Sequence, residues 1–189
     1  LTRFPENVSA AVREKTVLAA GRLTEVKRFD LLIEQFAHIH EREPEWKLRI
    51  LGEGEDRAKL EEQITKLGAG DYIMLTGRKN GDEVEREMLS ASIFAMSSRS
   101  EGFPFVLMEA QSCGLPIIAY DVRVGPGAVV HDGEDGVLVP EGERRQYEDK
   151  LCELMDSPEL REKMSANATA AIREFSEEKV AEKWYEVIE

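Results

Sequence analysis

The chain has 189 residues, of which 42% are hydrophobic and 33% are charged, and its net charge is −13 at pH 7. This composition is ordinary for a globular domain, and no apolar run approaches the roughly 18 residues that a membrane span needs. The negative charge disfavours nucleic acid as a partner and flat docking on an anionic membrane. A small anionic ligand is allowed, because local Arg and Lys side chains outweigh a distant charge that salt screens.

The first candidate element is a short apolar run at residues 16–21, and five similar runs follow it. Each is rich in aliphatic residues and often ends in Gly or a polar residue, as buried parallel strands do. We predict strands at residues 16–21, 47–52, 72–77, 92–97, 116–121 and 136–140.

Segments with apolar residues at helical spacing separate the runs, at 30–42, 57–68 and 82–92. The expected buried faces are Leu32, Phe36 and Ile39 in the first segment, and Leu60, Ile64 and Leu67 in the second. This alternation predicts an α/β fold with a Rossmann-like, doubly wound parallel sheet of about six strands and helices on both faces.

After residue 140 the chain becomes charged and helix-rich, and Ser157-Pro158 and Ser176 are typical of helix starts. The chain does not begin with Met, so we expect a piece of a longer protein. We predict one domain over 1–189, made of an interdomain lead-in at 1–15, an α/β core at 16–140 and a helical tail at 141–189.

The cysteines and histidines predict neither a disulfide framework nor a metal site. Cys113 and Cys152 lie far apart in sequence, which favours a reducing, cytosolic setting. His38 and His40 are two residues apart, so on a helix they point to different faces.

The first stretch that could carry chemistry is GRLTEVKRFD, residues 21–30, which follows the first strand. Ligands of doubly wound sheets bind at the carboxyl ends of the strands, where Arg22 is placed. A guanidinium there, with the ammonium of Lys27 near a helix start, suits a diphosphate. The stretch alone leaves open a solvated loop with two ordinary basic residues.

The second stretch is LGEGEDR, residues 51–57, in which Gly52 and Gly54 follow a strand. A dinucleotide-binding fingerprint would need a third glycine at the position of Arg57, so we reject it. A tight turn that lets a ligand approach the backbone is the alternative that we retain.

The third stretch is SRSEGFPFVLMEAQSCGLPII, residues 97–117. A helix that starts near Pro104 would direct its first amides at whatever lies above the strand end. Glu101 would lie just outside this helix and Glu109 over one turn within it, and carboxylates accept hydrogen bonds from vicinal sugar hydroxyls. The alternative is a plain helix with early acidic residues, for which Gly114 is the stop.

The fourth stretch covers residues 120–140. Gly125-Pro126-Gly127 is expected to start a short helix at the same rim of the sheet. Asp132 and Asp135 lack the spacing of a calcium loop, so we assign them to a tight turn before the last strand.

In this order, the stretches resemble the C-terminal, donor-binding half of a GT-B fold retaining glycosyltransferase of family 4 (glycosyl transferases group 1). The matching segments are GRLTEVKRFDLLIEQF, LRILGEGEDR, LTGR, SSRSEGFPFVLMEAQSCGLPIIAYDVRVGP and DGEDGVLVP. They run from residue 21 to about residue 140, and the helical tail fits the ending of this family.

The resemblance implies a role for each matching residue. Arg22 and Lys27 would hold the diphosphate of the donor and act in catalysis together with Glu101, which would contact the sugar. Glu109 would bind the ribose hydroxyls. The other implied donor-binding residues are Gly21, Gly52, Gly54, Arg78, Ser98, Gly102, Phe103 and Pro104.

The resemblance also implies an activity, namely the retaining, metal-independent transfer of a hexose from a nucleotide sugar. We expect this donor to be a UDP-sugar, and we expect no cofactor. The acceptor, which is a sugar, a lipid or a polymer, would be held mainly by an N-terminal domain that this chain lacks, so the chain alone should transfer little. We expect a cytoplasmic protein, with a peripheral position at the inner face of the membrane as an option for the full-length form.

The chain departs from the family pattern at two places. Gly127 and Ala128 stand where relatives have a serine and an acidic residue, and Pro104 replaces a common glycine. Two other functions are left open: another GT-B enzyme such as a nucleotide-sugar epimerase, and a non-catalytic nucleotide-binding module. The nucleotide, the sugar, the acceptor, the linkage and the oligomeric state are not predicted.

Overall fold

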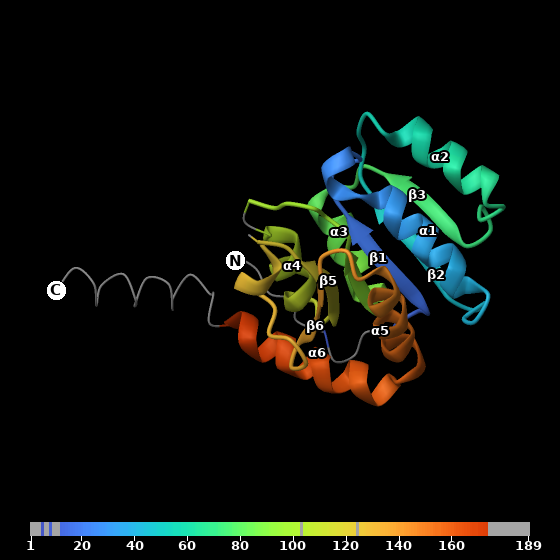
Figure 1. Ribbon diagram of the computed structural model, residues 1–189. Coiled ribbons are helices and arrows are strands. Elements are labelled where there is room, and N and C mark those ends of the chain that lie inside the picture. The colour runs from blue at the N-terminus through green and yellow to red at the C-terminus, as the bar shows by residue number, and fades with distance from the viewer. Residues whose placement is uncertain (1–4, 6–7, 9–11, 103, 124, 174–189) are drawn as a thin grey trace.

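The computed structural model describes residues 5, 8, 12–102, 104–123 and 125–173. These residues contain one parallel sheet with the strand order β3-β2-β1-β4-β5-β6 (Figure 1). The strands are β1 (Thr16–Ala20), β2 (Lys47–Leu51), β3 (Ile73–Gly77), β4 (Ile93–Met96), β5 (Ile117–Asp121) and β6 (Gly136–Pro140). The predicted fold class and all six predicted strands are confirmed.

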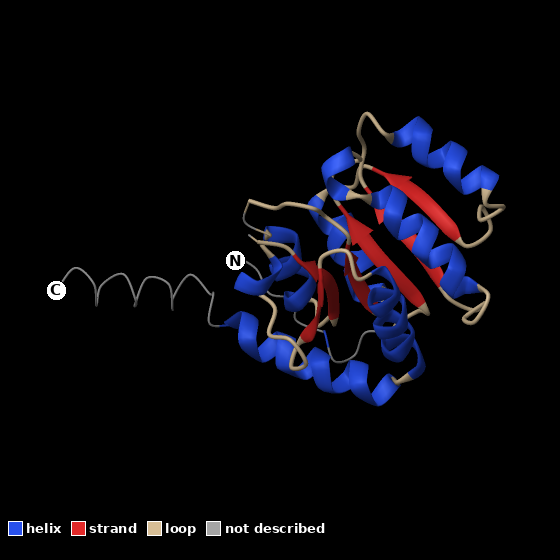
Figure 2. Ribbon diagram, viewed as in Figure 1, coloured by secondary structure: helices blue, strands red, loops and turns tan. Residues whose placement is uncertain are grey.

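Helices connect the strands and cover the sheet, as Figure 2 shows in blue. They are α1 (Phe29–His40), α2 (Arg57–Lys66), α3 (Gly81–Ser90), α4 (Phe105–Ser112), α5 (Arg144–Asp156) and α6 (Pro158–Ile172), with the 3-10 helices η2 (Glu25–Lys27) and η3 (Pro126–Ala128). The η3 helix confirms the short helix that Gly125-Pro126-Gly127 predicts at the rim.

Both faces of the central strands are buried, which explains why these strands are apolar without alternation. Val17 and Ala19 of β1 pack into a core cluster with α1, α2 and α5. Leu18, which lies between them, packs into a second cluster with α3 and α4. The period of two residues along a strand therefore divides β1 between the two cores, whereas the edge strand β3 contributes only to the first and exposes Met74.

Several helix ends form as the sequence predicts. The hydroxyl of Ser157 accepts from the amide of Leu160 at the start of α6, with Pro158 in the first turn. Gly114 has a φ of 66° just after α4, which is the left-handed conformation of a helix stop. Leu67 was expected on the buried face of α2, but it is 42% exposed because α2 ends at the residue before it. Ser176 lies outside the described residues.

Asp132 and Asp135 form the predicted turn before β6. The carboxylate of Asp135 is buried, and it accepts from the backbone amide of His131 and pairs with His131 Nδ1, both at 2.8 Å. Asp132 Oδ1 accepts from the amide of Leu138 at 2.9 Å. Both acidic side chains are thus used to hold the turn.

The contact between His131 and Asp135 predicts a pH dependence of stability. The hydrogen bond to Asp135 raises the pKa of His131 above its ordinary value, which is about 6.5. The folded chain therefore binds this proton more tightly than the unfolded chain. The resulting stability is fully present below about pH 6.5 and is lost as the pH rises through the raised pKa. We expect His131→Ala to lower the free energy of unfolding in urea more at pH 5.5 than at pH 9, and an equal effect at both pH values would contradict this.

The part of the chain that the structure describes contains no helix that is long and apolar enough to cross a bilayer. Both cysteines are free and buried, and burial raises the pKa of the Cys113 thiol to about 11. This thiol is therefore protonated at neutral pH. The division into lead-in, core and tail stays a prediction.

Candidate functional site

The strand order creates a crevice at one edge of the sheet. β1 has β2 on one side and β4 on the other. The helices that follow these two strands, α1 after β1 and α4 after β4, pack on opposite faces of the sheet. Ligands of doubly wound sheets bind at such a switch point, outside the carboxyl ends of the strands. A cavity of about 770 Å³ lies there, lined by residues at the ends of β1, β2 and β3.

The cavity brings together most of the residues that the sequence predicts for the site. They come from the ends of β1, β2 and β3, from the loop after β4 and from α4. The predicted residues that line it are Gly21, Arg22, Lys27, Gly52, Gly54, Arg78, Glu101, Pro104 and Glu109. Ser98 is buried and Gly102 is exposed, and neither is among the lining residues. Phe103 lies outside the described residues.

Lys27 and Glu101, which both line the cavity, form an ion pair although they lie on different loops. The ammonium nitrogen of Lys27 is 2.7 and 2.8 Å from the two carboxylate oxygens of Glu101. The side chains are only 21% and 9% exposed, so solvent screens the pair little. An ammonium has three N–H donors. Two are directed at Glu101, so one can serve an anion in the cavity at the same time.

Arg22 lies at the mouth of the cavity in a different environment. Its Nη2 atom is 3.3 Å from Glu55 Oε2, and both side chains are largely exposed, at 75% and 61%. Exposed pairs of this kind contribute little to stability, so Arg22 can leave Glu55 for a ligand at small cost. Arg78, at the end of β3, is also exposed. The cavity therefore contains one cation that an ion pair fixes in place, Lys27, and two exposed cations, Arg22 and Arg78, that can move toward a ligand.

Gly52 and Gly54 allow the loop after β2 to pack closely against the loop after β1. Gly52 has a φ of 143°, and a Cβ there would overlap the carbonyl oxygen of Gly21. A Cβ on Gly54 would lie 2.7 Å from the backbone nitrogen of Leu23. We predicted a ligand close to the backbone at this turn, whereas the structure places the loop after β1 against it. The donor-binding role of these glycines stays a prediction.

The start of α4 faces the cavity through Pro104, Phe105 and Val106. Pro104 is the residue before the helix rather than its first residue, and its carbonyl accepts from the amide of Leu107 at 2.9 Å. The first amides of a helix have no intrahelical acceptor, and the helix dipole places a partial positive charge there. The amino end of α4 thus adds to the positive potential at this side of the cavity.

Glu109 lies one turn into α4 and lines the cavity. The walls around it bury the carboxyl in part, and this burial raises its pKa above the ordinary value. An anionic carboxylate that has lost part of its hydration is a strong acceptor for hydroxyl groups. Gly125, from the rim beyond β5, packs on the other acidic residue: a Cβ on Gly125 would lie 2.8 Å from Cβ of Glu101.

Several further residues line the cavity that were not predicted from the sequence, namely Ala20, Leu51, Glu53, Lys79, Val84, Phe105 and Val106. For Lys79 the signal was present, because it directly follows Arg78 at a strand end. For Glu53 it was weaker, since a single acidic residue between two glycines reads as turn chemistry. Arg57 Nη1 is 2.6 Å from Glu53 Oε1, so the residue that rules out the dinucleotide fingerprint holds a side chain of the cavity.

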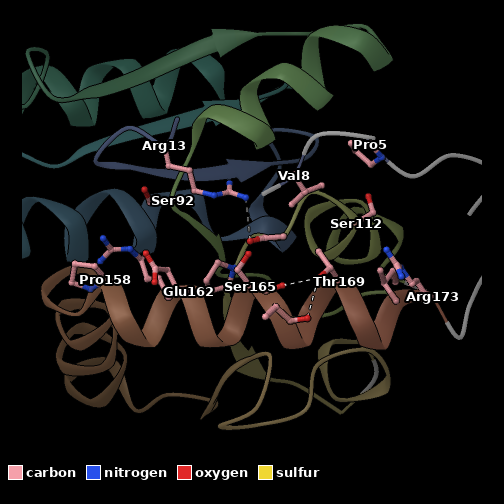
Figure 3. A pocket seen from close by; sticks show the side chains of 15 residues that line it. Pro5, Val8, Arg13, Ser92, Ser112, Pro158, Glu162, Ser165, Thr169 and Arg173 are labelled. Carbon is pink, nitrogen blue, oxygen red and sulfur yellow. Dashed lines mark hydrogen bonds between the residues drawn. The ribbon is translucent and has the colours of Figure 1, made fainter. Parts of the chain in front are cut away.

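A second cavity, of about 730 Å³, lies on another side of the fold, between α6 and the start of the described chain (Figure 3). Arg13 there donates to the carbonyls of Ala91 and Cys113, at 2.8 and 2.7 Å, beyond the ends of α3 and α4. Arg161 donates to Leu154 and Met155 at the end of α5, at 2.6 and 2.7 Å. Both guanidinium groups therefore cap helices, and we assign this cavity to helix packing.

Among the described residues, no group of three or more His, Cys, Asp or Glu side chains is placed to hold a metal ion.

Comparison with known proteins gives a consistent result. Residues 2–171 match the family described as glycosyl transferases group 1. The chain is 34% identical, over 194 residues, to the GtfA subunit of a UDP-N-acetylglucosamine–peptide N-acetylglucosaminyltransferase from Streptococcus parasanguinis, with 99% of this chain and 37% of that protein covered. The first curated relatives are longer proteins, of which the chain spans 51% and 37%.

Solved structures agree with this match. The pneumococcal O-GlcNAc transferase GtfA, in complex with UDP and GlcNAc, is 29% identical and superposes with a TM-score of 0.86, over 96% of this chain and 37% of that one. The C-terminal domain of a glycosyl transferase group 1 family protein, LpcC from Francisella tularensis, superposes with a TM-score of 0.78 at 22% identity, over 89% of this chain and 90% of that one. The second likeness concerns the fold alone.

Proposed function

This chain belongs to the glycosyl transferases group 1 family and has the fold of the C-terminal domain of GT-B glycosyltransferases, and on this premise we propose that it binds the sugar donor of a glycosyltransferase. The proposed donor is a UDP-sugar. The observation that carries the proposal is the convergence of Lys27, the amino end of α4 and Glu109 on one cavity at the switch point of the sheet.

Each part of the cavity suits one part of such a donor. The ammonium of Lys27 and the amino end of α4 suit the diphosphate, and the exposed Arg22 can add a bidentate contact. Glu109 suits the ribose hydroxyls, and Glu101, which holds Lys27, suits the transferred sugar. The name of the Streptococcus parasanguinis relative and the UDP in the pneumococcal structure support uridine as the base.

The proposed reaction is hexosyl transfer with retention at the anomeric carbon. The bond between that carbon and the phosphate oxygen of the donor breaks, and negative charge develops on the leaving UDP. A new bond forms from the carbon to a hydroxyl oxygen of the acceptor, whose proton passes to the leaving UDP. Fixed positive groups that face this charge lower the barrier without a metal ion. Lys27, the α4 dipole and Arg22 would supply them. The acceptor would be held by a further domain, so we expect little transfer by this chain alone.

We propose the cytoplasm as the compartment. Both described cysteines are free and buried, which suits a reducing environment. A peripheral position at the inner face of the membrane is part of this proposal for a longer form of the protein.

The function is tested by calorimetry with UDP, GDP and ADP, with and without a chelator. We expect binding of UDP that the chelator does not change. Glu109→Gln should weaken UDP binding about fivefold, because a neutral amide replaces a charged acceptor, a difference of about 1 kcal/mol. Glu153→Gln, on the exposed face of α5, is the matched control and should bind as the wild type does.

Two outcomes separate the parts of this proposal. Absence of heat with every nucleotide, in a folded sample, would contradict the donor site itself. If UDP binds but Glu109→Gln has no effect, only the role of Glu109 is wrong. A further comparison uses 2′-deoxy-UDP, for which the loss caused by Glu109→Gln should shrink, because one of the two hydroxyl partners is gone.

A further inference from the structure

Behind the lysine of the cavity lies a serine that does not line the cavity itself. Ser97 directly follows β4 and is only 3% exposed. Its hydroxyl donates a hydrogen bond to the backbone carbonyl of Lys27 at 2.8 Å. Two residues further along the same loop, the amide of Arg99 donates to the carbonyl of Val26 at 2.9 Å. The loop after β4 is therefore joined to the loop after β1 by two hydrogen bonds besides the ion pair between Lys27 and Glu101.

The backbone at Lys27 depends on such contacts because its own secondary structure is minimal. Lys27 is the last residue of η2, a single 3-10 turn of three residues, and such turns have poor hydrogen-bond geometry. Arg28, the next residue, has a φ of 52° and is the one non-glycine residue with a positive φ in the described chain. This conformation costs about 1–2 kcal/mol, so tertiary contacts must hold it.

We propose that Ser97 is a positioning residue for the anion-binding Lys27. Its hydroxyl holds the carbonyl of Lys27, which sets the point from which the long side chain extends toward the cavity. The ammonium then stays within reach of both Glu101 and the phosphate groups of the donor. The inference rests on the proposed function, and it assigns to Ser97 no contact with the donor.

The position of Ser97 provides a matched control at the other end of the same strand. Ser92 directly precedes β4, is buried like Ser97, and donates its hydroxyl to a backbone carbonyl, that of Glu14, at 2.6 Å. Ser92 lies at the amino end of the strand, away from the cavity. Loss of either hydroxyl removes one buried hydrogen bond of the same kind, so only a role in positioning Lys27 distinguishes the two.

The test is titration of the 15N-labelled chain with UDP, followed by NMR so that weak binding is measurable. Ser97→Ala is expected to weaken UDP binding about three- to tenfold, the effect of one hydrogen bond, whereas Ser92→Ala should bind UDP as the wild type does. Ser97→Thr, which keeps the hydroxyl, should restore binding. If the alanine variant does not fold, Ser97→Cys gives the same comparison, because a thiol of similar size is a weak donor.

A double-variant cycle shows whether Ser97 acts through Lys27. In the Lys27→Ala background, Ser97→Ala should cause no further loss of UDP binding. The inference is overturned if the wild type binds UDP and Ser97→Ala binds it equally well, or if the loss is undiminished in the Lys27→Ala background. A wild type that binds no UDP overturns the proposed function, and this inference with it.

Discussion

Replacing Lys27 with alanine is expected to weaken the binding of UDP by about 30- to 100-fold. The variant loses a charge-assisted hydrogen bond to the diphosphate, which contributes about 2–3 kcal/mol. It also leaves Glu101 without its partner, and the side chain of Glu101 is only 9% exposed. An unpaired, poorly hydrated carboxylate that faces phosphate groups adds repulsion to the loss.

The repulsion from the unpaired carboxylate of Glu101 can be tested separately. Lys27→Ala combined with Glu101→Ala removes the unpaired carboxylate, so the double variant should bind UDP more tightly than Lys27→Ala alone. The control is Lys66→Ala, since Lys66 is paired with Glu62 on the exposed face of α2 and lies outside the cavity. Calorimetry or NMR titration measures all four proteins. Wild-type affinity in the Lys27→Ala variant would show that Lys27 does not bind the diphosphate.

Replacing Gly52 with alanine is expected to lower the free energy of unfolding by about 3–5 kcal/mol, in the range of the most damaging single changes. The added Cβ would overlap the carbonyl oxygen of Gly21 and lie 2.9 Å from its carbonyl carbon. These atoms belong to backbone that is hydrogen-bonded, since the amide of Gly21 donates to Leu51 and that of Gly52 donates to Gly77. Neither loop can move without breaking the strand ends that form the cavity.

Variants at two other glycines distinguish backbone strain from steric overlap as the cause of the lost stability. Gly68 has a φ of 64° and no atom within 4 Å of an added Cβ, so Gly68→Ala measures backbone strain alone, about 1–2 kcal/mol. Gly70 has neither a positive φ nor a neighbour, and Gly70→Ala should change stability by less than about 0.5 kcal/mol. Urea unfolding of the three variants gives the comparison. If Gly52→Ala costs no more than Gly68→Ala, the close approach of Gly21 is not what requires a glycine at this position.

The fold was predictable because its requirements are local. A strand that is covered on both faces must be an apolar run, such as residues 16–20, and its ends need residues that turn the chain. The same locality explains the confirmed cap at Ser157 and the stop at Gly114. It also explains the error at Leu67, since the helix ended before the periodic pattern did, and element ends are the part of a pattern that local spacing constrains least.

The candidate site was predictable in part, for a different reason. In a doubly wound sheet the carboxyl ends of the strands meet at one edge, so Arg22, Lys27, Glu101 and Glu109 could be assigned to one region from their order in the chain. The residues that contact these side chains could not be assigned from the sequence. The resemblance assigned Ser98 to the donor, and only the structure shows that the hydroxyl of its neighbour Ser97 holds the backbone of Lys27.

The sequence by itself thus determined the order of the elements, the burial of the sheet and the rim on which the polar residues lie, because each follows from hydrophobic spacing and turn chemistry within a short window. The tertiary structure decided which of those residues touch. Lys27 and Glu101 are 74 residues apart and meet at 2.7 Å because β1 and β4 are neighbours in the sheet. Strand order is set by the packing of the whole chain, and no local pattern contains it.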